Sequence, residues 1–145
     1  MDALEILRDM HVEAKAAFQK IEQASPDQRG GMWNKLRPEL VHHEQIEERF
    51  VYDPVARDVG SSDPTLSGRD QRHHKEVGEA EHLIEQIGGM EPHEDRWLQM
   101  VVQLRSALER HIQTEESEIW PRIRQFWGAD KLEQAAGPMQ QAKAA

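Results

Sequence analysis

Two short segments place a histidine and a glutamate where an amphipathic helix carries apolar side chains. At about 100° per residue, His43 and Glu47 share one helical stripe with apolar neighbours, and His111 and Glu115 do the same in a later segment. The apolar members of the two stripes are Trp33, Leu36, Leu40 and Phe50 in the first segment and Trp97, Val101, Leu104 and Leu108 in the second. Burying an unpaired carboxylate is costly, so such a group is normally paired with a cation or bound to a metal. The two His-x-x-x-Glu pairs therefore predict a metal site inside a helical core.

The same two segments end alike, which indicates an internal pseudo-repeat. In the first, Glu47 and Glu48 are followed by Tyr52 and Pro54. In the second, the corresponding residues are Glu115, Glu116, Trp120 and Pro121. We therefore expect two related helix pairs.

Each of the two remaining helical segments adds an inward histidine. His11 lies on the apolar stripe of the first segment, and aligning the two halves places His74 at the equivalent position of the third. The adjacent His73 competes, because it continues the cleaner apolar stripe of that segment. That stripe consists of Val77, Ala80, Ile84 and Ile87. We expect His74 in the site, with His73 as an extra ligand or a supporting partner.

The expected site has one histidine from each of four helices and one glutamate from each of two. Its members are His11, His43, Glu47, His74, His111 and Glu115. Two imidazoles for each ion, with both carboxylates bridging the two ions, give a set of nitrogen and oxygen ligands that suits iron, manganese or zinc. The chain contains no cysteine, which excludes thiolate ligands. These residue types predict a dinuclear site in the core of a helix bundle.

Helical periodicity covers almost the whole chain, and no segment alternates like a strand. The expected helices span residues 2–23, 26 to between 52 and 56, 69–87, 92–119 and 130–140. Pro38 predicts a kink about one turn before His43. Trp120-Pro121 predicts a break or bend at the end of the fourth long helix, and Gly137-Pro138 predicts an interruption of the last helix. The longest loop is expected over Gly60–Gly68. Four long helices with short connections predict an all-α fold, an up-down-up-down four-helix bundle with a short C-terminal fifth helix, as a single domain over residues 1–145.

The charge balance limits the classes of partner. The net charge is −9, and 31% of the residues are charged. Nucleic acid and anionic membranes bind basic patches, so neither is an expected partner. The N-terminal residues are amphipathic and acidic, unlike a signal peptide, and no stretch is apolar enough to span a membrane. We therefore expect a cytoplasmic protein.

Two other interpretations of the polar residues stay open. A single histidine on an apolar stripe is usually a hydrogen-bonded core residue, and the pairs Glu47-Glu48 and Glu115-Glu116 can belong to solvated faces. A different metal site would use Glu39-x-x-His42 and Glu79-x-x-His82, since Glu-x-x-His pairs are typical of ferritin-like di-iron bundles. That alternative is the weaker one, because His42 and His82 lie off the apolar stripes.

At these residues the chain resembles the hemerythrin-like family of HHE cation-binding domains. The matching segments are LRDMHVEAKAAF around His11, HHEQIEERFVY around His43, HHKEV around His74, HIQTEESEIWP around His111 and the closing helix LEQAAGPMQQAKAA. The resemblance covers nearly the whole chain. It implies a four-helix bundle that holds two iron ions in a non-haem di-iron centre with carboxylate and oxo or hydroxo bridges. It also implies a small ligand, namely dioxygen, peroxide or nitric oxide.

The chain departs from the oxygen-carrying hemerythrins in two helices. Those proteins have a His-x-x-x-His pair on the third helix, where His74 is followed four positions later by Gly78. On the fourth helix they have His-x-x-x-x-Asp in place of His111-x-x-x-Glu115. Fewer histidines leave positions for water or for a further carboxylate, and Glu44 is the nearest spare one, as in some HHE-type iron sites. Open positions favour peroxide or nitric oxide chemistry over reversible dioxygen carriage.

The resemblance implies one of two classes of function. One is an enzyme, a di-iron peroxidase or a protein with catalase-like activity. The other is a module that binds iron, dioxygen or nitric oxide in order to sense or store it, without turnover. Release of dioxygen from added hydrogen peroxide distinguishes the two classes.

Overall fold

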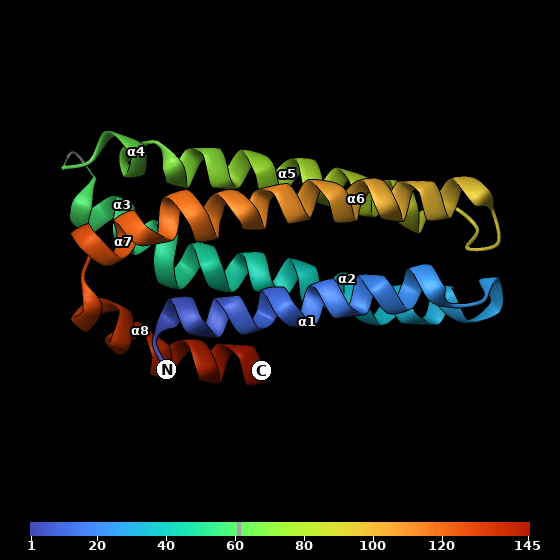
Figure 1. The fold of residues 1–145 in the computed structure, drawn as a ribbon, viewed down its shortest axis with the longest axis horizontal. Helices are drawn as coiled ribbons and strands as arrows, with labels where there is room; N and C mark the ends of the chain where they lie inside the picture. Colours follow the sequence, from blue (N-terminus) through green and yellow to red (C-terminus); the bar gives the residue numbers. More distant parts are fainter. Residues whose placement is uncertain (61) are drawn as a thin grey trace.

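Four long antiparallel helices form the body of the protein. The computed structural model describes residues 1–60 and 62–145, and every regular element among them is helical. The long helices are α1 (Ala3–Gln23), α2 (Pro26–Glu47), α5 (Arg69–Gly88) and α6 (Asp95–Thr114). Figure 1 shows the α1–α2 and α5–α6 connections at one end of the bundle, with successive helices running in opposite directions. The predicted up-down-up-down four-helix bundle is confirmed.

Shorter elements close the opposite end of the bundle. They are η1 (Glu48–Tyr52), α3 (Asp53–Val59), α4 (Pro64–Ser67), η2 (Glu115–Ile119) and α7 (Trp120–Phe126). The loop expected over Gly60–Gly68 contains α4, and its residue Ser61 lies outside the described residues. The fifth long element, α8 (Ala129–Ala144), packs against α1 and α2 (Figure 1). The interruption predicted at Gly137-Pro138 is wrong, because α8 continues through Pro138.

A π turn joins each half of the bundle to its closing segment. The N–H of Asp53 donates to the carbonyl of Glu48, and the N–H of Trp120 donates to that of Glu115, five residues back in each case. A proline follows at once in both halves, in the first turn of α3 or α7, where a missing N–H is tolerated. The chain stays helical past Pro121, so the break predicted as one possibility at Trp120-Pro121 does not occur, and the bend predicted as the other stays a prediction. The kink predicted at Pro38 stays a prediction, since α2 includes that residue without a break in its helical assignment.

The apolar core consists of two clusters separated by a polar layer. The α7-end cluster draws on α1, α2, α8 and the closing segments, and includes Leu4, Leu7, Ile46, Val51, Trp120, Ile123 and Met139. The turn-end cluster lies beside the interhelical turns and includes Phe18, Ile21, Leu36, Leu40, Ile84, Trp97 and Leu104. On α1, His11 lies between Leu7 of one cluster and Phe18 of the other. On α2, His43 lies between Leu40 and Ile46 in the same way. The polar layer thus crosses the bundle between the two clusters.

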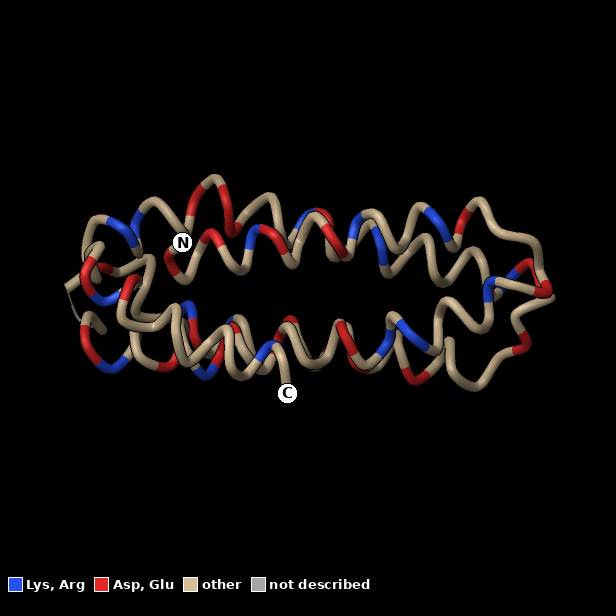
Figure 2. The backbone as a smooth tube through the Cα atoms, turned by 90° about the horizontal axis from the view of Figure 1, so that it is seen from below, with Lys and Arg blue, Asp and Glu red and all other residues tan. Residues whose placement is uncertain are grey.

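The charged residues lie mostly on the outside of the bundle. Figure 2 shows acidic and basic positions interleaved along its whole length. Among the residues that the structure describes, none of the helices combines the length and the hydropathy needed to cross a bilayer.

Candidate metal centre

Each of the four long helices brings a histidine into the polar layer. His11 comes from α1, His43 from α2, His73 from α5 and His111 from α6. The rings of His11 and His43 lie 4.8 Å apart between centroids, and those of His73 and His111 lie 5.4 Å apart. Two glutamates join them, Glu47 at the end of α2 and Glu115 at the start of η2, both with no exposed surface.

The ligand atoms of this layer are buried and lack hydrogen-bond partners within the chain. They include Nε2 of all four histidines, both carboxylate oxygens of Glu47, Oε2 of Glu44 and Oε1 of Glu115. An unsatisfied buried polar atom costs about 1–3 kcal/mol, and more where it is charged, so folded proteins rarely retain many of them. Eight such atoms in one layer fit a site that holds cations.

The ligand atoms fall into two adjacent groups. Glu44, Glu47, His73 and His111 place one ligand atom each within 4.8 Å of one another. His11, His43 and Glu47 form the second group, with the same spacing. Glu47 belongs to both groups, and its Oε2 lies 3.2 Å from His43 Nε2 and 3.4 Å from His73 Nε2. One carboxylate thus faces both groups, as a bridging ligand must.

Glu115 makes a second link between the two groups. Its Oε1 lies 3.0 Å from His111 Nε2 and 3.7 Å from His11 Nε2. Its other oxygen accepts a hydrogen bond of 2.5 Å from the hydroxyl of Tyr52. Tyr52 therefore fixes the orientation of this carboxylate, and Oε1 stays directed at the two histidines.

Three further carboxylates hold the outer nitrogens of the histidines. His11 Nδ1 is hydrogen-bonded to Glu116 Oε2 at 3.1 Å, and His73 Nδ1 to Glu48 Oε1 at 3.2 Å. His111 Nδ1 lies 2.6 Å from Glu76 Oε2. A carboxylate on Nδ1 places the proton there and leaves Nε2 free to bind metal, an arrangement found around the histidines of most protein metal sites.

The π turns place an aromatic ring against one histidine in each half. Trp120, directly after η2, stacks on His11 with ring centroids 5.2 Å apart and an interplanar angle of 12°. Tyr52, the last residue of η1, packs on His73 with centroids 4.5 Å apart. The pseudo-repeat seen in the sequence therefore corresponds to two related supports of the centre.

The glutamates favour protonation of three of the histidines. Burial acts to lower the pKa of His43, but contact with Glu47 outweighs burial and raises the pKa to about 9. Burial is outweighed in the same way by carboxylates at His73 and His111, whose pKa values rise to about 10 and about 11. At His11 burial and the charge of His43 prevail, and the pKa falls to about 4. The layer thus attracts positive charge, which either protons or metal ions can supply.

The two central carboxylates differ in their affinity for a proton. Burial and the neighbouring charge of Glu47 raise the pKa of Glu115 to about 8. Burial also acts to raise the pKa of Glu47, but the close contacts with Glu115, His43 and His73 hold it well below its usual range. The closely spaced pair therefore retains a proton at neutral pH unless a cation replaces it.

The structure corrects the choice between the adjacent histidines of α5. His73 is fully buried, with Nε2 3.0 Å from Glu44 Oε2, whereas the side chain of His74 is 52% exposed. His74 faces outwards, with Nε2 3.5 Å from Asp70 Oδ1 and 3.6 Å from Asp53 Oδ1. The apolar stripe decides how α5 is rotated, and His74 lies about 100° away from it. The alignment of the two halves was shifted by one residue.

The other predicted site residues are brought together as expected. His11, His43, Glu47, His111 and Glu115 all lie in the layer, and Glu44 joins one of the two groups. Their binding of metal stays a prediction. The ferritin-like alternative loses its support, because Glu39, Glu79 and His82 are exposed. His42 instead donates a hydrogen bond of 2.8 Å to the carbonyl of Ala142, near the end of α8.

The carboxylates that hold the outer nitrogens of the histidines were not predicted from the sequence. Glu48 and Glu116 were considered only as possible members of solvated faces, and Glu76 was not among the predicted site residues. In the sequence, Glu48 directly follows Glu47 and Glu116 directly follows Glu115, so both positions could have been predicted from the two glutamates of the layer. Glu76 lies one turn after His73, and Arg69, itself buried, donates to both of its oxygens.

His73→Ala should remove most of the bound metal, whereas His74→Ala should leave the metal content unchanged, because only His73 directs Nε2 into the layer. Elemental analysis of iron-loaded, desalted protein measures this difference. Circular dichroism of both variants checks that each is folded. An equal loss of iron in both variants would contradict the corrected orientation.

Glu116→Gln should weaken iron affinity by about 10–100-fold, since loss of a carboxylate that supports a ligand histidine typically has that effect. Glu118→Gln serves as the matched control, because Glu118 is exposed two residues further along the same π turn. Competition with a chelator of known affinity gives the two dissociation constants. Identical constants for the two variants would show that the Glu116 contact does not support His11.

Metal should stabilise the fold more strongly as the pH rises from about 7 to about 9. In the metal-free chain, protonation of His43, His73 and His111 stabilises the fold because their pKa values are raised. This stabilisation is complete at a pH below the pKa of a histidine in the unfolded chain. That contribution is lost as the pH rises through their folded values of about 9, 10 and 11. Metal competes with these protons, so it binds more tightly as they leave.

Thermal melts with and without a chelator test this linkage. The melting temperature of the metal-free protein should fall across this pH range, and the gap to the metal-loaded protein should widen. A gap that narrows with rising pH would contradict the assignment of the raised pKa values.

Comparison with known proteins identifies the family of the chain. A DNA nickase from Nostoc sp. (strain PCC 7120 / SAG 25.82 / UTEX 2576) is 25% identical over 144 residues, which cover 99% of this chain and 39% of the nickase. No solved structure matches the chain. The hemerythrin HHE cation-binding domain matches residues 2–123, which include every residue of the polar layer. The chain therefore belongs to the hemerythrin HHE cation-binding domain family.

Proposed function

We propose that the protein holds a carboxylate-bridged, non-haem di-iron centre that reacts with peroxide. The same centre would also bind dioxygen or nitric oxide. The observation that carries this proposal is the pair of adjacent groups of unpartnered nitrogen and oxygen atoms that share Glu47. The ligand set consists of histidines and carboxylates without a cysteine, which suits iron, with manganese and zinc as the alternatives. A cytoplasmic location is part of the same proposal.

The residues of the layer would divide the ligand positions between two ions. His73 and His111, with Glu44 as an additional carboxylate, would hold one ion, and His11 and His43 would hold the other. Glu47 and Glu115 face both groups and would serve both ions. A bound di-iron centre supplies Lewis-acid and redox chemistry to a small ligand.

The surrounding residues orient the ligands and control protons. Tyr52 holds one oxygen of Glu115, while Glu48, Glu76 and Glu116 hold the outer histidine nitrogens. The α7-end cluster and the turn-end cluster keep water from both sides of the layer. Glu44 has a buried Oε2 and lines two cavities, so it places a carboxylate beside an incoming peroxide.

The similarity to the nickase does not extend this proposal to nucleic acid. The chain spans 39% of the length of that protein, so the activity of the whole nickase is not carried over to this chain. The net charge of −9 and the interleaved charges of Figure 2 support a small-molecule partner instead. Binding, sensing or storage of iron without turnover is the second candidate, and the same experiment separates it.

Iron-loaded protein should contain about two iron ions per chain, because each bridging glutamate faces two groups of ligands. It should consume hydrogen peroxide, and dioxygen release measured with an electrode shows whether the activity is catalase-like. Glu115→Gln should reduce consumption by at least about tenfold, because an amide nitrogen cannot act as a bridging ligand. Metal-free protein is the control. Two bound irons without peroxide consumption would favour the binding, sensing or storage module.

A further inference from the structure

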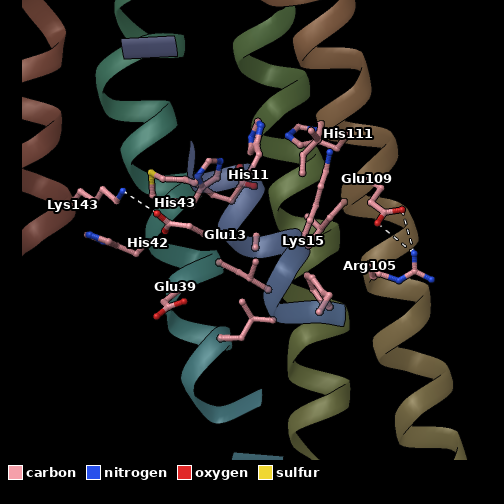
Figure 3. Close-up of a pocket in the computed structure, with 18 residues that line it drawn as sticks. His11, Glu13, Lys15, Glu39, His42, His43, Arg105, Glu109, His111 and Lys143 are labelled. Atoms are coloured by element: carbon pink, nitrogen blue, oxygen red, sulfur yellow. Dashed lines mark hydrogen bonds and ion pairs between the residues drawn. The ribbon is translucent and has the colours of Figure 1, made fainter. Parts of the chain in front are cut away.

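A cavity of about 190 Å³ opens beside the polar layer, between α1, α2 and α6. At its inner end lie His11, His43, His111 and Glu44, and Figure 3 shows the three histidines together at that end. The rest of the lining combines charged side chains with apolar ones, among them Ala14, Phe18, Leu36, Leu40, Leu108 and Ile112. The cavity therefore places an apolar wall surface beside the side chains of the candidate metal centre.

The size of the cavity exceeds the needs of the small ligands considered above. Dioxygen, nitric oxide and hydrogen peroxide each have two heavy atoms. An apolar protein cavity of about 150 Å³ binds benzene and stays free of water, because water finds too few hydrogen bonds in it. A cavity of about 190 Å³ has room for an aromatic ring with a short substituent. Its walls would stabilise such a ring by removing apolar surface from water.

The charges around the cavity favour an uncharged ligand. The lining carries Glu13, Glu39, Glu44 and Glu109 against Lys15, Arg105 and Lys143, so the two signs nearly balance. Lys143, near the end of α8, lies 3.5 Å from Glu13, and Arg105 lies 3.0 Å from Glu22 and 3.2 Å from Glu109. These cations are neutralised by carboxylates, and the net charge of −9 repels anions further.

We propose that this cavity binds an uncharged organic molecule with a compact apolar body, about the size of cumene hydroperoxide, and directs its polar end to His11, His43 and His111. The binding of the apolar body rests on the shape and the apolar walls of the cavity. The identity of the polar end as a peroxide rests on the proposed function. The substrate class of the centre is then organic hydroperoxides as well as hydrogen peroxide.

Two residues on opposite walls allow the cavity to be filled. Ala14 lines it from α1 and Leu108 from α6, and both are only partly buried. Ala14→Leu and Leu108→Phe each add side-chain volume on a wall of the cavity. Ala16→Leu is the matched control, because Ala16 is exposed on the same helix as Ala14. Circular dichroism and melting curves check folding, and Leu108→Phe carries the test if Ala14→Leu does not fold.

Titration calorimetry of the iron-loaded proteins with cumyl alcohol tests the proposal, since this alcohol has the same apolar body and cannot react as a peroxide. Wild type and Ala16→Leu should show saturable binding at a single site. Both cavity-filling variants should bind about tenfold more weakly or not at all. No saturable binding to wild type, or equal binding to all four proteins, would overturn the proposal.

Peroxide consumption measured on the same preparations separates this proposal from the proposed function. If the wild type consumes hydrogen peroxide but does not bind cumyl alcohol, the cavity proposal is overturned and the proposed function stands. If the wild type binds cumyl alcohol and both cavity-filling variants do not, the cavity is supported as a ligand site. This holds even if no preparation consumes peroxide and the proposed function fails.

Discussion

The fold depends on a layer of buried nitrogen and oxygen atoms that divides its apolar core in two. Glu47 and Glu115 are fully buried in this layer, and the chain alone supplies too few hydrogen bonds for their oxygens and for the four Nε2 atoms. A carboxylate moved out of water is tolerated only when a cation or a proton compensates its charge. The two apolar clusters fix the helices at a spacing that keeps these atoms together. Stability and metal affinity are therefore properties of the same layer.

Support for the layer comes from the ends of the helices as much as from the helices themselves. Each π turn begins where its helix leaves the layer, and an aromatic residue at the end of the turn returns to cover a histidine. A π turn accommodates one more residue than an α turn and is frequent at functional sites. Here it lets Tyr52 pack on His73 and hydrogen-bond to Glu115, which belongs to the other half. The two halves thus orient each other's ligands.

Much of this arrangement was predictable because burial sets the rotation of each helix. The apolar stripes of α1, α2 and α6 placed His11, His43, Glu47, His111 and Glu115 correctly, since apolar residues surround each of them on its own helix. The same rule applied to α5 would have selected His73. The internal repeat favoured His74 instead, and that prediction was wrong because repeated segments need not keep the same register. The partners of Nδ1 were not predictable in this way, because helical periodicity gives the face of a residue and not its contacts across helices. The π turns were missed because proline is normally read as the end of a helix.

The register of α5 also determines how the centre differs from an oxygen carrier. With His73 as the inward histidine, the residue four positions later is Val77, so the departure from a His-x-x-x-His pair persists after the correction, with Val77 in place of Gly78. Val77 lines a second cavity of about 320 Å³ between α5 and α6, and this cavity also reaches Glu44 and His111. The lining of this second cavity includes Glu76, Glu79 and Arg110, and the cavity between α1, α2 and α6 likewise combines charged and apolar side chains. A valine cannot bind metal, so an ion held by His73 and His111 would have a position free for an exchangeable ligand. The two cavities would give small molecules two routes to that position, one between α5 and α6 and one between α1, α2 and α6.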